Sequence, residues 1–130
     1  MNLIEILGII IVHWVADFVL QSDEDAKGKS KYMKNLVSHT LLYSLFWITP
    51  LLAYATLSDF YHLKVNNIIH NTFDFVVITF IFHTITDYFT SRLNAKLWAE
   101  QKTHSFFVSI GFDQVLHYAQ LFITFYIIYK

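Results

Sequence analysis

Four long apolar stretches alternate with short polar stretches along the chain. The apolar stretches cover residues 3–20, 36–57, 72–90 and 106–129. Each is close to the ~20 residues that an α-helix needs to cross ~30 Å of hydrocarbon. The pattern therefore predicts one domain over residues 1–130, with transmembrane helices at about residues 3–21, 36–57, 72–92 and 106–129.

Charged residues are missing where a water-soluble helix would need them. Residues 36–57 contain no Asp, Glu, Lys or Arg, and neither do the twelve residues before Lys130. Helices of a soluble bundle keep a polar face toward water. Of all residues, 55% are hydrophobic and only 15% are charged. The sequence thus favours an all-α, integral membrane four-helix bundle over a soluble one.

Several other classes are disfavoured by what the chain lacks. No basic residue precedes the first apolar stretch, and Asp17 and Gln21 lie where a signal peptide would be cleaved, so we expect this helix to be retained. Cysteine is absent, so any metal must be held by nitrogen and oxygen. The four lysines of residues 27–34 follow three acidic residues, a pattern that does not favour nucleic-acid binding.

Basic residues are distributed unevenly among the connections. The first connection holds four lysines and the third holds Arg92, Lys96 and Lys102, whereas the second holds only Lys64. Cytoplasmic loops of membrane proteins are enriched in Lys and Arg. We therefore expect a multi-pass protein of the bacterial inner membrane with both termini outside.

A histidine and an aspartate recur four residues apart in three of the predicted helices. The pairs are His13 with Asp17, His83 with Asp87, and Asp113 with His117. Residues four apart share a helix face. The parallel first and third helices carry the same spacing, which is compatible with two parallel two-helix repeats.

These ionisable residues fall at a common depth in the predicted helices. At ~1.5 Å per residue they lie roughly 5–15 Å from the cytoplasmic ends, and His39 joins them. A shared site that opens toward the cytoplasm explains this match. The predicted metal ligands are His13, Asp17, His39, His83, Asp87, Asp113 and His117.

A buried charged layer of this kind needs compensation. One charged Asp deep in a transmembrane helix costs at least ~2.5 kcal/mol. A divalent transition metal removes that penalty, as one ion or as two sharing a carboxylate or water, and so does His–Asp pairing with some carboxylates protonated. Zinc, manganese and iron all accept this mixture of donors, and we expect zinc first. A single His or Asp can instead form a structural hydrogen bond between helices, but the layer as a whole favours metal or proton chemistry.

Further polar residues adjoin the layer. Gln21, Tyr43, Arg92 and Gln114 could orient the ligands, although polar packing between helices explains them equally well. Lys102 and His104, together with Arg92, could face an anionic headgroup at the mouth of the site.

Four motifs resemble a known family. They are His-Trp-x-x-Asp-Phe-x-x-Gln at 13–21, His39 with Tyr43, His-x-x-x-Asp-Tyr at 83–88, and Ile-Gly-x-Asp-Gln-x-x-His-Tyr at 110–118. Together they are similar to the small bacterial and phage membrane proteins of domain-of-unknown-function family 3307, over nearly the whole chain. This resemblance supports the topology and the choice of residues but implies no reaction. A looser similarity links the chain to membrane-bound metal-dependent hydrolases.

Three functions remain open at this point. The first is a metal-dependent hydrolase whose lipid or amphiphilic substrate enters from the inner leaflet. The second is an interaction or regulatory protein of the membrane with a structural His/Asp layer. The third is a proton or divalent-cation transporter, which would need a homo-oligomer because four helices form a thin wall for a pore.

Overall fold

The computed structural model describes residues 1–60 and 67–130, and every regular element in these ranges is helical. The elements are α1 (Leu3–Trp14), η1 (Val15–Val19), α2 (Asp23–Gly28), α3 (Met33–Phe46), α4 (Ile48–Phe60), α5 (Ile68–Ala99) and α6 (Thr103–Tyr129). The predicted all-α fold is confirmed. Lys64, on which part of the predicted orientation rests, lies outside the described residues.

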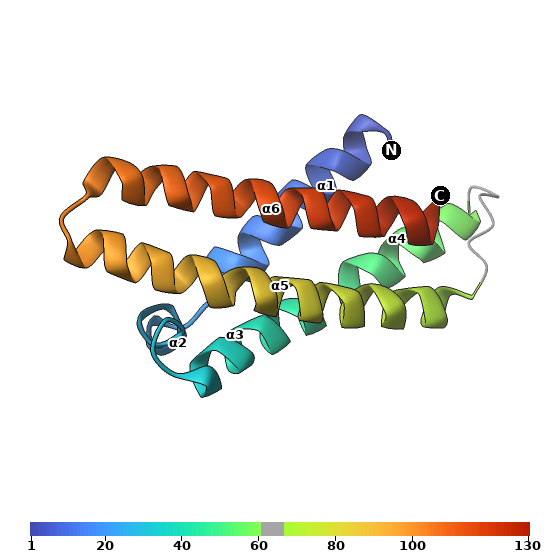
Figure 1. The fold of residues 1–130 in the computed structure, drawn as a ribbon. Coiled ribbons are helices and arrows are strands. Elements are labelled where there is room, and N and C mark those ends of the chain that lie inside the picture. Colours follow the sequence, from blue (N-terminus) through green and yellow to red (C-terminus); the bar gives the residue numbers. More distant parts are fainter. Residues whose placement is uncertain (61–66) are drawn as a thin grey trace.

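The two longest helices, α5 and α6, form an antiparallel hairpin and lie side by side along their whole length (Figure 1). α5 begins before and ends after the predicted range of 72–92. The tight turn between them includes Gln101, which has a positive φ of 56°. α5 also contacts α3 and α4, so it is the central helix of the bundle.

The predicted helix over residues 36–57 is broken into α3 and α4. α3 ends at Phe46 and α4 begins at Ile48. Pro50 explains the break, because a proline ring clashes with the carbonyl group four residues before it, here that of Phe46. The helical hydrogen bonds resume when the amide of Leu51 donates to the carbonyl of Trp47 at 3.1 Å.

The first helical segment changes its winding where Asp17 lies. The 12-residue α1 continues into η1, a π-helical turn of 5 residues, and crosses α6 at an angle (Figure 1). The amide of Leu20 donates to the carbonyl of Val15, five residues earlier. The chain then enters α2, whose first amides are capped by the Ser22 side chain.

Within the described ranges, three helical segments are long and apolar enough to cross a membrane: residues Met33–Leu57, Ile68–Ala99 and Thr103–Tyr129. Large apolar side chains such as Phe82, Phe89, Phe112 and Ile127 project outward from α5 and α6. A surface of this kind suits lipid rather than water. The segment formed by α1 and η1 is shorter, so a fourth crossing remains a prediction.

The interior of the bundle has an apolar part and a polar part. The apolar part is the cluster of Ile9, Ala16, Tyr43, Trp47, Leu51, Phe75, Leu121 and Phe125. Beyond this cluster, on the side toward α2, histidine and aspartate side chains fill the interior. At the opposite end, the Lys130 ammonium lies 2.6 Å from Glu5 Oε1 and joins the two ends of the chain.

Candidate metal centre

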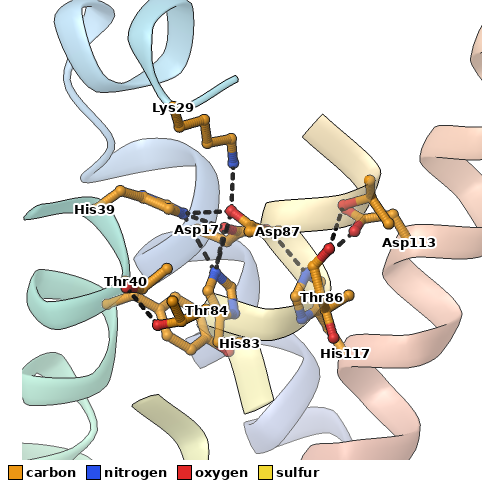
Figure 2. Close-up of polar contacts among 12 residues, drawn as sticks. Asp17, Lys29, His39, Thr40, His83, Thr84, Thr86, Asp87, Asp113 and His117 are labelled. Carbon is orange, nitrogen blue, oxygen red and sulfur yellow. Dashed lines mark hydrogen bonds and ion pairs between the residues drawn. The ribbon is translucent and has the colours of Figure 1, made fainter. Parts of the chain in front are cut away.

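Four buried side chains converge where η1, α3 and α5 meet (Figure 2). Asp17 comes from η1, His39 from α3, and His83 and Asp87 from successive turns of α5. Each is at most 4% exposed. One potential ligand atom of each residue lies within 4.8 Å of the others. The group could therefore hold a metal ion.

The histidine nitrogens in this group face the carboxylate oxygens and each other. Nε2 of His39 lies 3.0 Å from Asp17 Oδ1 and 3.4 Å from Asp87 Oδ2. Nε2 of His83 lies 3.4 Å and 3.7 Å from the same two oxygens. The two Nε2 atoms are 3.3 Å apart. All these atoms surround one small volume.

A second group shares Asp87 with the first. Asp87, Asp113 and His117 form another set of potential ligands. Nε2 of His117, on α6, lies 3.2 Å from Asp87 Oδ1 and 3.4 Å from Asp113 Oδ1. The rings of His83 and His117 are stacked, with their centroids 4.2 Å apart. The two oxygens of Asp87 thus face different ligand groups.

Lys29, from the connection after α2, reaches into the cluster. Its ammonium lies 2.8 Å from Asp87 Oδ2, and its side chain is 19% exposed. Burial opposes its charge, but the carboxylates of Asp87 and Asp17 outweigh that effect and raise the pKa of Lys29 above its ordinary value. Lys29 is therefore a cation at neutral pH and offsets part of the negative charge.

The connection that carries Lys29 is held against α3 by a close approach at Gly28. A Cβ atom at Gly28 would come within 2.7 Å of the Asn35 side chain. The Asn35 amide donates to the Glu24 carbonyl at 3.3 Å. Glycine at this position lets the backbone pack against α3 and brings Lys29 toward Asp87.

His13 is buried beside the cluster but belongs to neither ligand group. Its Nδ1 lies 2.7 Å from the Tyr43 hydroxyl, and its Nε2 lies 2.9 Å from Gln114 Oε1. Asp17 Oδ2 is farther away, at 3.8 Å from Nε2. The π-helical turn that contains Asp17 departs from the α-helical period, and such turns are frequent at functional sites. Asp17 is directed toward His39 and His83 instead.

Two of the neighbouring polar residues connect parts of the cluster. The Tyr43 ring stacks on His83 with centroids 3.9 Å apart, while its hydroxyl contacts His13. Gln114 joins two residues, because its Oε1 accepts from His13 Nε2 and its Nε2 donates to Asp113 Oδ2 at 3.3 Å. Nε2 of Gln21 is buried and has no hydrogen-bond partner among the described residues.

Arg92, Lys102 and His104, which we expect at the mouth of the site, make other contacts or are exposed to the surroundings. Arg92 donates to the Tyr88 carbonyl at 2.7 Å and covers the Tyr88 ring. Lys102 pairs with Glu100 at 2.8 Å, and the His104 side chain is exposed. None of the three contacts the ligand groups.

Two features of the site were not predicted from the sequence. Lys29 was treated as part of a solvated basic connection, and α2 was not expected. The signal for α2 is present, because Ser22 followed by Asp23, Glu24 and Asp25 is a typical helix start. No signal in the sequence singles out Lys29 from its neighbouring lysines.

Comparison with known proteins identifies one family. Residues 6–130 match the family model described as protein of unknown function (DUF3307), in agreement with the resemblance drawn from the motifs. No curated protein and no solved structure matches the chain. The looser similarity to membrane-bound metal-dependent hydrolases is therefore unconfirmed.

Proposed function

The chain belongs to the DUF3307 family, and we propose that it is a metal-dependent hydrolase of the membrane that acts on a lipid or another amphiphile. The metal ligands in this proposal are Asp17, His39, His83 and Asp87 at one position and Asp87, Asp113 and His117 at an adjacent one. Zinc is the first choice, with manganese and iron as alternatives.

The spacing of the first four donors carries the proposal. Ligands held ~2.0–2.1 Å from a tetrahedral zinc ion are roughly 3.3–3.4 Å from one another. The separations among the histidine nitrogens and the facing carboxylate oxygens run from 3.0 to 3.7 Å. Hydrogen bonding alone does not require two imidazole nitrogens to face each other at 3.3 Å and share the same carboxylate oxygens.

The balance of charge supports the same proposal. Asp17, Asp87 and Asp113 are distributed over two ligand groups that share Asp87, and among the described residues Lys29 is the only Lys or Arg side chain that forms an ion pair with one of them. Buried carboxylates without enough compensating charge are costly. A divalent cation supplies that charge.

The shared carboxylate of Asp87 favours a pair of metal ions. In two-metal sites the ions lie ~3.5–4 Å apart. Each oxygen of Asp87 faces its own donor group, as a bridging carboxylate requires. A bound metal would supply a Lewis acid for an ester or phosphoester oxygen and a water that loses its proton near neutral pH.

The protein side chains have separate tasks in this proposal. The Lys29 ammonium, 2.8 Å from Asp87, is positioned to stabilise negative charge on a substrate oxygen. Asp113 and His117, with Oδ1 and Nε2 3.4 Å apart, would hold the second ion, and where only the first ion binds they can hold or transfer a proton. Tyr43 and Gln114 position the rings and carboxylates that surround the reacting groups.

For the membrane orientation, we propose the cluster in the cytoplasmic half of the inner membrane and both termini outside. The segments that carry the lysines, which are α2, the start of α3 and the turn between α5 and α6, lie at the same end of the bundle (Figure 1). Loops rich in Lys and Arg stay in the cytoplasm.

The second candidate is a membrane interaction protein with a structural His/Asp layer. It is favoured by one observation: the Lys29 ammonium pairs with Asp87 and the His39 ring with Asp17, so side chains of the layer can satisfy one another. A transporter is less well supported, because the apolar cluster around Trp47 and Phe75 fills the interior beyond the polar layer. A path for ions would have to cross it.

Metal analysis combined with an activity assay tests the hydrolase. We expect detergent-purified protein to retain about one or two zinc ions per chain and to hydrolyse amphiphilic esters or phosphoesters. His39→Gln should lose both properties, whereas Asp23→Asn, which removes an exposed carboxylate, should keep them. Correctly folded wild-type protein without bound metal would favour the interaction protein instead.

A further inference from the structure

A cavity of about 830 Å³ adjoins the candidate metal centre at its lysine side. It lies between the α2–α3 connection and the ends of α5 and α6 that flank their turn. Lys29 lines this cavity and also contacts Asp87. Only the Lys29 side chain would therefore separate a group bound in this cavity from Asp87.

One side of the cavity is cationic. Lys27, Lys29 and Lys31 line it together with Ser30, and none of the residues that line it is acidic. Lys27 is paired with Asp23 at 3.1 Å, but that carboxylate does not line the cavity. Three lysines around one space favour a negatively charged occupant.

Two polar side chains of α5 lack a partner at this cavity. Ser91 Oγ and Asn94 Oδ1 are buried and have no hydrogen-bond partner among the described residues. Both residues line the cavity, and Ser91 is 9% exposed. Buried polar groups are normally hydrogen-bonded. An occupant with donor and acceptor oxygens would satisfy them.

The other side of the cavity is apolar and aromatic. It is formed by Trp98, Phe106, Phe107 and Ile110, with the Trp98 and Phe106 rings 5.0 Å apart. Phe107 is 62% exposed on the outer surface of the bundle. A hydrocarbon chain can lie along this side and continue into the bilayer.

We propose that this cavity binds an anionic phospholipid-like amphiphile, with its phosphate beside Lys27, Lys29 and Lys31 and its acyl chain along Trp98 and Phe107. This inference rests on the proposed hydrolase in naming the amphiphile as the substrate class. The volume of the cavity accommodates a headgroup and part of one chain. The phosphate then lies next to the Lys29 ammonium that contacts Asp87.

Native mass spectrometry of the full-length protein in detergent tests the proposal. Phosphatidate, phosphatidylcholine and diacylglycerol are added separately, and inorganic phosphate is added as a competitor. We expect phosphatidate to bind at least about fivefold more tightly than the other two lipids. Excess inorganic phosphate should displace little of it, because the acyl chain contributes to binding.

Matched variants locate the binding site. Lys27→Gln combined with Lys31→Gln should weaken phosphatidate binding at least about fivefold. The control, Lys34→Gln combined with Lys96→Gln, removes two exposed lysines that do not line the cavity and should bind as the wild type does. Phe107→Ala should weaken the binding of phosphatidate but not the binding of inorganic phosphate.

Each remaining outcome has a defined meaning. Equal binding of phosphatidate and phosphatidylcholine, or equal losses in both double variants, would overturn the proposal. Full displacement by inorganic phosphate would show a free-anion site and overturn the lipid assignment. Zinc content is measured in the same preparations. Selective phosphatidate binding without bound metal would contradict the hydrolase and support the lipid site. Bound metal without lipid selectivity would support the metal site and contradict the lipid site.

Discussion

The Nε2 atoms of His39 and His83 lie 3.3 Å apart, although the two residues are 44 positions apart in the chain. His39 is on α3 and His83 on α5, and both nitrogens face the carboxylates of Asp17 and Asp87. Packing of α3 against α5 brings them together, aided by the hydroxyls of the next residue on each helix, Thr40 and Thr84, which lie 2.8 Å apart. If one metal ion binds to these four side chains, the loss of any one of them should weaken metal binding by the other three.

Asp17→Asn and Asp87→Asn should each reduce zinc affinity by at least ~100-fold, beyond the 10–100-fold typical of residues that only support a ligand. The double variant should lose less than the sum of the two single losses, because both residues serve one site. Competition with a chelating dye measures the affinities. Asp23→Asn is the control, since its carboxylate is exposed and far from the cluster. Two additive losses would contradict a shared site.

His13→Gln and His83→Gln should differ in their effect on metal. His13 contacts Tyr43 and Gln114 and lies outside both ligand groups, so its loss should lower stability by about 1–3 kcal/mol while most of the metal stays bound. His83→Gln should abolish binding at the four-residue group. Elemental analysis and thermal melting of both variants check this. Equal loss of metal in the two variants would return His13 to the ligand set.

Lys29→Gln should strengthen metal binding, by about tenfold, because it removes a positive charge beside Asp87 Oδ2. The same variant should be less stable than the wild type when a chelator is present, since Asp87 then loses its partner. Thermal melting with and without zinc measures both effects. Lys34→Gln, which changes an exposed lysine on the next helix, serves as control.

The pH dependence of the Lys29 contribution follows from its pKa, which is raised. A group with a raised folded pKa contributes stability below its unfolded pKa of ~10.4 and loses it only as pH rises through the folded value. With a chelator present, the difference in melting temperature between the wild type and Lys29→Gln should therefore stay constant from pH 7 to pH 9. A difference that vanishes within this range would contradict a charged Lys29.

Metal release should set in under mild acid. Histidine ligands must be deprotonated, so protons compete with the metal as pH falls through ~6.5. We expect loss of metal and of thermal stability between about pH 7 and pH 5, and recovery with excess zinc by mass action. In a purely structural His/Asp layer, protonating an imidazole beside a carboxylate strengthens the pair. Unchanged melting under mild acid, with no response to chelator, would support that alternative.

Cysteine labelling can test the proposed orientation, because the chain has no native cysteine. Lys34→Cys, at the start of α3, should be protected from an impermeant reagent in intact cells. His70→Cys, near the start of α5 at the opposite end, should react. Labelling of Lys34→Cys but not of His70→Cys would show the opposite orientation.

Length and spacing along the chain were sufficient to predict an all-helical fold and the histidines and aspartates that could form a polar layer. Apolar stretches of transmembrane length predict helices because a backbone in lipid must satisfy its own hydrogen bonds. The break at Pro50 and the start of α2 at Ser22 were also readable from local rules, since both depend on neighbouring residues only. The position of each His/Asp pair along its predicted helix placed the polar side chains at one depth in the membrane.

Tertiary structure alone decided which of these side chains meet. Depth along a helix is one coordinate, whereas contact also depends on rotation about the helix axis and on the packing partner. His13 and Asp17 share a spacing with His83 and Asp87, yet the π-helical turn directs Asp17 to His39 and leaves His13 with Tyr43 and Gln114. Lys29 reaches Asp87, 58 positions away, only because α2 packs against α3. Contacts between distant segments have no signal in local sequence.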